Sequence, residues 1–265
     1  MRGATDTHIH FYDRAVPPAP GTLMPGHFDV AMYRDLQQRL GLERVVVVQP
    51  NAYRDDNRVT LDAVKALGDS ARAVVVVTEK NSEDELEAMS QAGAVAQRFF
   101  NLPGGSVQFD RMHEIMARVQ PLGWHANLQL DGRELPKYEA QIRRLPGQFV
   151  IDHNGKFLEP VAPEHAAFKT LLSLVDTGRC WVKLSAPYET SKSGAPKYED
   201  VSRLARVLVE HAPERMLWAT NWPHPTLPPG TLEDRDLLHL LEDWAPREAD
   251  RRRILVDNPA QLYGF

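Results

Sequence analysis

Two histidines near the start of the chain, His8 and His10, are separated by a single residue. Side chains in a β-strand alternate between its two faces, so residues two apart point the same way. If residues 5–10 form a strand, Asp6, His8 and His10 line one face. Imidazole exchanges protons near neutral pH and is a common metal ligand. The pair therefore indicates acid–base chemistry, or binding of a metal ion or a substrate oxygen.

The elements that must position these histidines are short apolar segments, which alternate with longer amphipathic ones. The runs 45–48 and 74–77 contain only valine. Such β-branched runs are typical of strands buried on both faces of a parallel sheet. We predict eight strands, at residues 5–10, 44–49, 73–78, 95–100, 124–130, 149–153, 181–185 and 216–220.

Helical segments lie between these strands. The segments 30–40 and 59–67 each end at a glycine, and Ser82 and Glu85 have the spacing of a capping box. Further helices are predicted at 110–120, 163–177 and 201–211, with a closing helix at 247–262. Strands that are each followed by a helix predict a single-domain (β/α)8 TIM barrel over residues 1–265. The alternative is a doubly wound open sheet, but no glycine-rich phosphate turn follows the first strand.

A barrel of this kind carries its functional side chains at the C-terminal ends of the strands or just beyond them. Nearly every predicted strand ends in polar residues of the types that perform chemistry. In chain order these are His8, His10, Gln49, Asn51, Thr78, Glu79, Arg98, Asn101, Asn127, Gln129, Asp152, His153, Lys183, Ser185, Tyr188, Asn221 and His224. Their convergence on one end of a barrel predicts an enzyme.

Composition narrows the possible partners. The net charge is −5 and there is no dense block of lysine and arginine, which argues against nucleic acid. No apolar run approaches the roughly 18 residues of a membrane span, so we expect no membrane partner. The single cysteine, Cys180, lies in an apolar run and is expected to be a core residue. Its solitary state fits a reducing compartment, and we expect a cytoplasmic protein that binds a small molecule.

Six segments spread over nearly the whole chain, 6–10, 123–125, 152–156, 182–185, 218–225 and 257–263, carry a family resemblance. The most specific is the box Thr220-Asn221-Trp222-Pro223, with His153 upstream. Together the segments resemble the amidohydrolase superfamily, in its branch of small barrel enzymes (amidohydrolase-2 type) that includes a pyrone dicarboxylate lactonase and a galactarolactone isomerase. The resemblance implies a (β/α)8 barrel that acts on the ester C–O bond of a lactone.

One residue departs from the pattern of this family. Asn221 stands where most members have an aspartate that ligates a metal or accepts a proton from water. A neutral amide cannot act as a general base and is a poor replacement for an anionic ligand. A Zn²⁺ ion on His8, His10 and His153 is an alternative. The lactonase and the isomerase that the chain resembles work without metal, so the resemblance implies a metal-independent reaction without a cofactor.

The resemblance also suggests roles in a reaction on a sugar-acid lactone. His8, His10 and His153 would stabilise the charge that develops on the carbonyl oxygen. Asn221 would orient a hydroxyl group or a water molecule, and His224 or His153 would accept the proton.

The remaining polar residues are expected to bind the substrate, with Lys183 or Arg98 holding its carboxylate. This set comprises Gln49, Asn51, Arg98, Asn127, Gln129, Lys183, Ser185 and Tyr188. Asp152 is expected to face the other way from His153, and Glu189 to repel a second substrate carboxylate.

Three outcomes remain open for such a site. Hydrolysis is the usual reaction of the family. Loss of the aspartate suits isomerisation, in which a substrate hydroxyl, already at high effective concentration, displaces the ring oxygen. The third outcome is a degenerate member that binds a sugar acid without turning it over.

Overall fold

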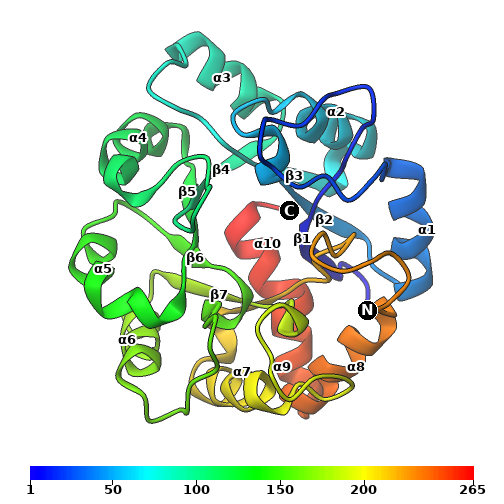
Figure 1. Ribbon diagram of the computed structural model, residues 1–265, viewed down its shortest axis with the longest axis vertical. Coiled ribbons are helices and arrows are strands. Elements are labelled where there is room, and N and C mark those ends of the chain that lie inside the picture. Colours follow the sequence, from blue (N-terminus) through cyan, green and yellow to red (C-terminus); the bar gives the residue numbers. More distant parts are fainter.

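Eight parallel strands form a barrel at the centre of the molecule, in the computed structural model that describes all residues from 1 to 265. The strands neighbour one another in sequence order, and the helices surround them (Figure 1). The strands are β1 (Thr5–Ile9), β2 (Arg44–Val48), β3 (Ala71–Val75), β4 (Ala94–Phe100), β5 (His125–Gln129), β6 (Phe149–Ile151), β7 (Cys180–Leu184) and β8 (Met216–Trp218).

One helix follows each strand, and a short helical tail completes the chain. The helices are α1 (Val30–Leu40), α2 (Arg58–Leu67), α3 (Glu83–Gln91), α4 (Met112–Val119), α5 (Leu135–Arg143), α6 (Ala166–Val175), α7 (Glu199–His211), α8 (Asp234–Trp244), α9 (Glu248–Arg252) and α10 (Asn258–Tyr263). A π-helical turn, Arg253–Asp257, joins α9 to α10, so the predicted closing helix is nearly continuous. No helix has both the length and the apolar character to cross a membrane.

The predicted (β/α)8 barrel is confirmed, and the open sheet is excluded. Backbone bonds across the seam beyond β8 bring the last strand back to the first: the Asn221 N–H donates to His8 O at 3.0 Å and the His10 N–H donates to Trp222 O at 2.8 Å. β3 begins two residues earlier than expected, at Ala71. α5 and α8 were not among the helices that we predicted.

The valine run of β2 contributes to two apolar layers, one on each face of the strand. Val45 and Val47 belong to the core between the strands and the helices, whereas Val46 and Val48 face the barrel interior with Trp181. This alternation buries both faces of the strand, as expected for a parallel sheet covered by helices. The inner layer therefore fills the barrel near the N-terminal ends of its strands.

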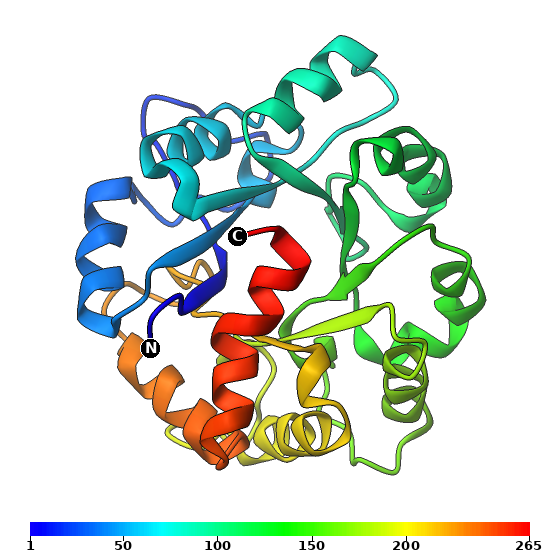
Figure 2. The ribbon, with the colours of Figure 1, turned by 180° about the vertical axis from the view of Figure 1, so that it is seen from behind.

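The C-terminal helix closes that same end. Tyr263 of α10 packs into the inner apolar layer, and the backbone carbonyl of Tyr263 accepts a hydrogen bond from Arg72 at 3.2 Å. Figure 2 shows α9 and α10 lying across this end of the barrel. His125 and Tyr263 pack edge to face with ring centroids 5.4 Å apart, so His125 lies deep in the barrel. Only the opposite end is left for a functional site.

Candidate active site

A cavity of about 310 Å³ opens at the C-terminal ends of the strands. A larger cavity, of about 470 Å³, lies outside the barrel beside α1 and α2 and contains none of the predicted site residues. The smaller cavity is therefore the candidate active site. It is lined by six predicted residues (His10, Asn51, Arg98, Gln129, His153 and Asn221) and also by Tyr12, Lys156 and Glu189, which were not among the predicted site residues.

His8 of β1 and His10, just beyond the end of that strand, point into the barrel interior. The register between β1 and β2 shifts between Asp6 and Ile9, so the strand bulges there. The bulge corrects the expectation that Asp6 shares a face with His8 and His10. The Asp6 carboxylate instead accepts bonds from Thr220 Oγ1 at 2.6 Å and from Tyr33 of α1 at 3.3 Å. Burial raises the pKa of Asp6 to about 7, against the opposing effect of the bonds from Thr220.

The two histidines form a chain of hydrogen bonds whose direction is fixed. His10 Nδ1 lies 2.7 Å from Val48 O, and a carbonyl oxygen only accepts, so Nδ1 carries the proton. His10 Nε2 then accepts from His8 Nε2–H at 3.2 Å. His8 Nδ1, left without a proton, accepts from Lys183 Nζ at 3.1 Å. Burial lowers the pKa of both imidazoles well below its usual value, so both are neutral.

Lys183 lies beneath the cavity rather than on its wall. Its ammonium donates to Asn127 Oδ1 at 2.9 Å and forms an ion pair with Asp152 Oδ1 at 3.2 Å, and all three side chains are buried. Asn127 Nδ2 donates in turn to Asp152 Oδ2 at 2.8 Å. Asp152 is itself buried, yet the Lys183 ammonium keeps its pKa well below its usual value. Lys183 and Asn127 thus hold His8 in place, although both were predicted to bind substrate.

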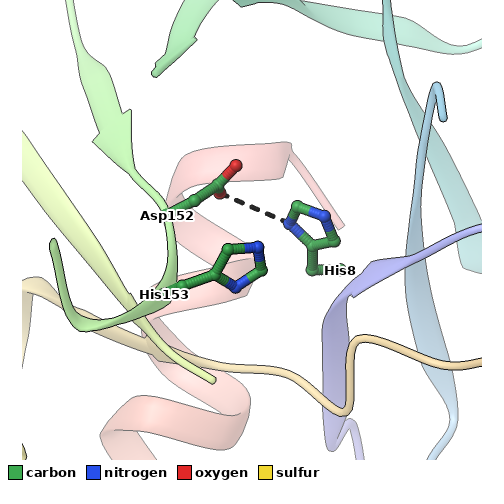
Figure 3. A group of neighbouring side chains, drawn as sticks. All are labelled: His8, Asp152 and His153. Carbon is green, nitrogen blue, oxygen red and sulfur yellow. Dashed lines mark ion pairs between the residues drawn. The ribbon is translucent and has the colours of Figure 1, made fainter. Parts of the chain in front are cut away.

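The structure corrects the expectation that Asp152 faces away from the site. Val150 faces the barrel interior, so Asp152, two residues on, faces it too. Figure 3 shows Asp152 directed at His8, 3.3 Å from its Nδ1, with His153 beside them. His153 points inward only because β6 ends at Ile151 and His153 takes a left-handed conformation with φ 55°. Its Nδ1 is held by Ser185 Oγ at 2.8 Å, and burial keeps its pKa well below the usual value.

Arg98 is the one cation of the cavity wall without a carboxylate partner. Its Nη1 donates to Gln49 O at 2.6 Å and its Nη2 to Gln129 Oε1 at 2.7 Å. Its Nε is buried and has no hydrogen-bond partner. The Gln49 side chain instead braces the loop after β2 through Arg54 O and Asp56 O. An unpaired guanidinium N–H beside a cavity suits an anionic ligand.

Glu189 brings a carboxylate into the cavity from the loop after β7. It is paired with Lys156 Nζ, from the turn after β6, and its Oε1 accepts from Asn221 Nδ2 at 3.3 Å. Only 8% of the Glu189 side chain is exposed. Although burial opposes it, Lys156 is the main cause that lowers the pKa of Glu189 to about 2. The expected repulsion of a second substrate carboxylate is therefore offset by Lys156.

A second hydrogen-bonded chain supports Asn221 from behind. Asn221 Nδ2 donates to Tyr188 Oη at 2.9 Å, Tyr188 Oη lies 3.0 Å from His224 Nδ1, and His224 Nε2 lies 2.9 Å from Asp234 Oδ1. A carboxylate cannot donate, so Nε2 carries the proton and Tyr188 donates to Nδ1. Both nitrogens of His224 are thus engaged outside the cavity, and Tyr188 and His224 act on the site through Asn221.

The donor set does not fit a divalent metal ion. Each of His8, Asp152 and His153 places a potential ligand atom within 4.8 Å of the others. Lys183 Nζ, however, lies 3.1 Å from His8 Nδ1 and 3.2 Å from Asp152 Oδ1, so its ammonium group already contacts two of these three residues. In the alternative set of His8, His10 and His153, the Nε2 atoms of His8 and His10 are bonded to each other at 3.2 Å. Both nearby carboxylates are already committed to lysines.

Comparison with known proteins agrees with this geometry. The family model described as amidohydrolase matches residues 5–265. The chain belongs to the amidohydrolase family. It is 36% identical over 270 residues to D-galactarolactone isomerase from Agrobacterium fabrum, which covers 99% of this chain and 91% of that protein.

Two further relatives are similar over nearly their whole length. The chain is 35% identical over 274 residues to 4-sulfomuconolactone hydrolase from Hydrogenophaga intermedia, with 99% of this chain and 89% of that one covered. An apo crystal structure from Agrobacterium tumefaciens superposes with a TM-score of 0.93 at 37% identity, over 100% of this chain and 97% of the other. The resemblance inferred from the motifs is confirmed, and the group to which this amidohydrolase is similar contains enzymes named for action on lactones.

Proposed function

We propose that this amidohydrolase is a metal-independent lactone hydrolase that opens the ester C–O bond of a sugar-acid lactone. The observation that carries the proposal is Arg98, a buried guanidinium at the cavity wall whose Nε lacks a partner. Around the cavity, the cations Arg98, Lys156 and Lys183 outnumber the carboxylates Asp152 and Glu189. A lactone that bears one carboxylate supplies the missing anion, and the amide and hydroxyl groups nearby suit its hydroxyl groups.

The chemistry needs a polarised carbonyl and an activated nucleophile. The His153 imidazole lines the cavity beside Asn221, where a hydrogen bond to the lactone carbonyl oxygen stabilises the negative charge of the tetrahedral intermediate. One such donor typically contributes about 3 kcal/mol to the transition state. Arg98 holds the substrate carboxylate and so fixes the position of the ring.

Metal independence rests on the buried ammonium of Lys183. A metal cation at His8 would lie within a few ångströms of the Lys183 ammonium, which together with burial already lowers the pKa of His8. No free carboxylate remains to offset the added charge. In this proposal the buried Lys183 orients His8, a role that a metal ion would otherwise have at this site.

Lactone isomerisation is a second candidate, favoured by a specific observation. Asn221 offers no carboxylate at the end of β8, and a substrate hydroxyl beside the carbonyl needs less activation than water. The 36% identity to a galactarolactone isomerase supports the same alternative. The two reactions share the tetrahedral intermediate and differ only in the oxygen that attacks.

The test is a proton NMR time course of the metal-analysed protein with a panel of aldonic and aldaric lactones. We expect the open acid to appear directly, with the rate unchanged within twofold after dialysis against a chelator. A second lactone that appears before any open acid would replace hydrolysis by isomerisation. Loss of activity on chelation, restored by Zn²⁺, would overturn metal independence. Thermal stabilisation by the lactones without turnover would indicate a binding protein.

A further inference from the structure

The proton acceptor of this site is not at the position where the family resemblance would place it. The end of β8 offers the amide of Asn221, which cannot accept the proton of an attacking hydroxyl. One carboxylate nevertheless lies beside that amide and lines the same cavity: Glu189 Oε1 accepts from Asn221 Nδ2 at 3.3 Å. The negative charge missing from β8 is thus supplied from the loop after β7.

The other basic groups near the cavity are already engaged. Both nitrogens of His224 are bonded to Tyr188 and Asp234. Asp152 is bonded to Asn127 and paired with Lys183 beneath the cavity wall, and it does not line the cavity. The lone pair of His10 Nε2 accepts from His8. His153 Nδ1 lies 2.8 Å from Ser185 Oγ, and its other nitrogen donates to the lactone carbonyl oxygen in the proposed function, so it is not free to accept the proton.

We propose that Glu189 is the general base of the lactone reaction, a catalytic role that rests on the proposed function. One carboxylate oxygen accepts the proton of the attacking hydroxyl, from water or from the substrate, as the new C–O bond forms. The carbonyl π electrons move onto the carbonyl oxygen. When that carbonyl reforms, the ring C–O bond breaks and the Glu189 carboxylic acid returns the proton to the leaving oxygen. Atoms and charges balance without a further reactant.

The ion pair with Lys156 provides a way to change the strength of this base. The groups that face Glu189 are Lys156 and His153 from the turn after β6, Asn221 and Thr226 beyond β8, and Arg98 and Tyr12 across the cavity. Lys156 is the direct partner and stabilises the ionised form. A substrate that draws the Lys156 ammonium onto its own oxygen leaves a buried carboxylate with weaker compensation, and such a carboxylate is a stronger base.

The sharpest test moves the carboxylate from one residue to its neighbour. Glu189→Gln is compared with Asn221→Asp and with the double variant Glu189→Gln/Asn221→Asp, using the best lactone found for the wild-type protein. General bases typically contribute 10²–10⁴-fold, so we expect Glu189→Gln to lower kcat by about 100-fold or more with a smaller change in KM. We expect the double variant to recover at least tenfold, because the Asn221→Asp substitution restores a carboxylate at the same wall of the cavity.

Matched controls separate a lost base from a damaged fold. Glu164→Gln removes an exposed carboxylate before α6 and is expected to leave kcat unchanged. Glu189→Asp keeps the charge but withdraws it by one methylene, and an intermediate kcat is expected even if Glu189→Gln folds poorly. Circular dichroism and thermal unfolding report the fold of each variant.

The outcomes distinguish this proposal from the one on which it rests. If the wild-type protein turns over a lactone and the kcat of Glu189→Gln stays within threefold of the wild-type kcat, the role of Glu189 is overturned and the lactone reaction stands. A folded Glu189→Gln that loses activity without recovery in the double variant also overturns it, because any carboxylate at this wall should serve. Absence of turnover by the wild-type protein overturns the proposed function and this role together.

Discussion

Two lysine–carboxylate pairs lie within the same barrel, and their surroundings give them different roles. Lys183 and Asp152 are fully buried beneath the cavity, where His8 and Asn127 add further contacts. Lys156 and Glu189 lie at the cavity wall and retain 9% and 8% exposure. This deep pair is enclosed by His8 and Asn127 and does not line the cavity, so it fixes geometry. The upper pair has the cavity on one side, so its partners can be exchanged for those of a substrate.

Removing the cation of the deep pair should have the largest effect on stability. Lys183→Met leaves the Asp152 carboxylate buried without its counter-charge, and breaking such a pair costs about 3–5 kcal/mol. We expect the free energy of unfolding in urea to fall by that amount, with activity lost because His8 loses the donor to its Nδ1.

The double variant Lys183→Met/Asp152→Asn provides the control for this prediction. It removes both charges, so it should be more stable than the single variant, in keeping with a favourable coupling between the two sites. A single variant that loses less than about 1 kcal/mol, the cost of an ordinary substitution, would show that the deep pair does not hold the site together.

Arg98 sharpens the comparison, because it is the wall cation without a carboxylate. Arg98→Met should raise KM about 30-fold for a lactone that carries a carboxylate, in line with about 2 kcal/mol for a hydrogen bond to a charged group. A matched lactone without the carboxylate serves as the control and should show little change. Steady-state kinetics on the two substrates checks this. An equal rise in KM for both lactones would mean that Arg98 maintains the structure of the cavity wall and does not bind the substrate carboxylate.

The Lys156–Glu189 pair should determine how activity depends on pH. A general base must be ionised, so activity falls as the pH drops through its pKa. Lys156 holds the pKa of Glu189 at about 2, below the range in which most enzymes are assayed. Lys156→Met removes the main cause that lowers this pKa and leaves the burial that raises it. We therefore expect an acid limb of kcat/KM to appear at mildly acidic pH in the variant.

The exposed Lys80 offers a matched control for this shift. Lys80→Met should keep the profile of the wild-type protein. The double variant Lys156→Met/Glu189→Gln should lose the new limb together with most of the activity. An acid limb that persists without Glu189 would have to be assigned to another group.

The fold and the residues at the strand ends can be predicted from the sequence, because the pattern of apolar residues indicates where the strands lie and which side chains face inward. Continuous valine runs identify strands with two buried faces, and a period of two places Arg98 and Lys183 on the inner face. Asp152 was misjudged because the alternation was counted from His153, which lies beyond the end of β6. Counting from Val150 would have placed it inside.

Other features of the site have no periodic signal in the chain. The left-handed conformations of His153 and Asn221, with φ 55° and 61°, are set by the folded loops around them. Lys156 and Glu189 lie in loops, where sequence spacing does not report direction. Their pairing depends on the neighbouring positions of β6 and β7 in the barrel. The β1 bulge that turns Asp6 outward likewise depends on pairing with β2.

The smallest effect is expected in the chain that supports Asn221, because it lies outside the cavity. Asp234→Asn replaces the acceptor-only carboxylate that fixes the proton of His224 with an amide that can also donate, and Tyr188→Phe removes the next link to Asn221. Each should lower kcat by roughly fivefold with little change in KM, and the double variant should lose no more than either single, since links of one network are not additive. Asp236→Asn, an exposed acid of the same helix, is the control. Losses that multiply in the double variant would mean that Tyr188 and Asp234 act on the reaction separately, and Asn221 would then be positioned chiefly by its contact with Glu189.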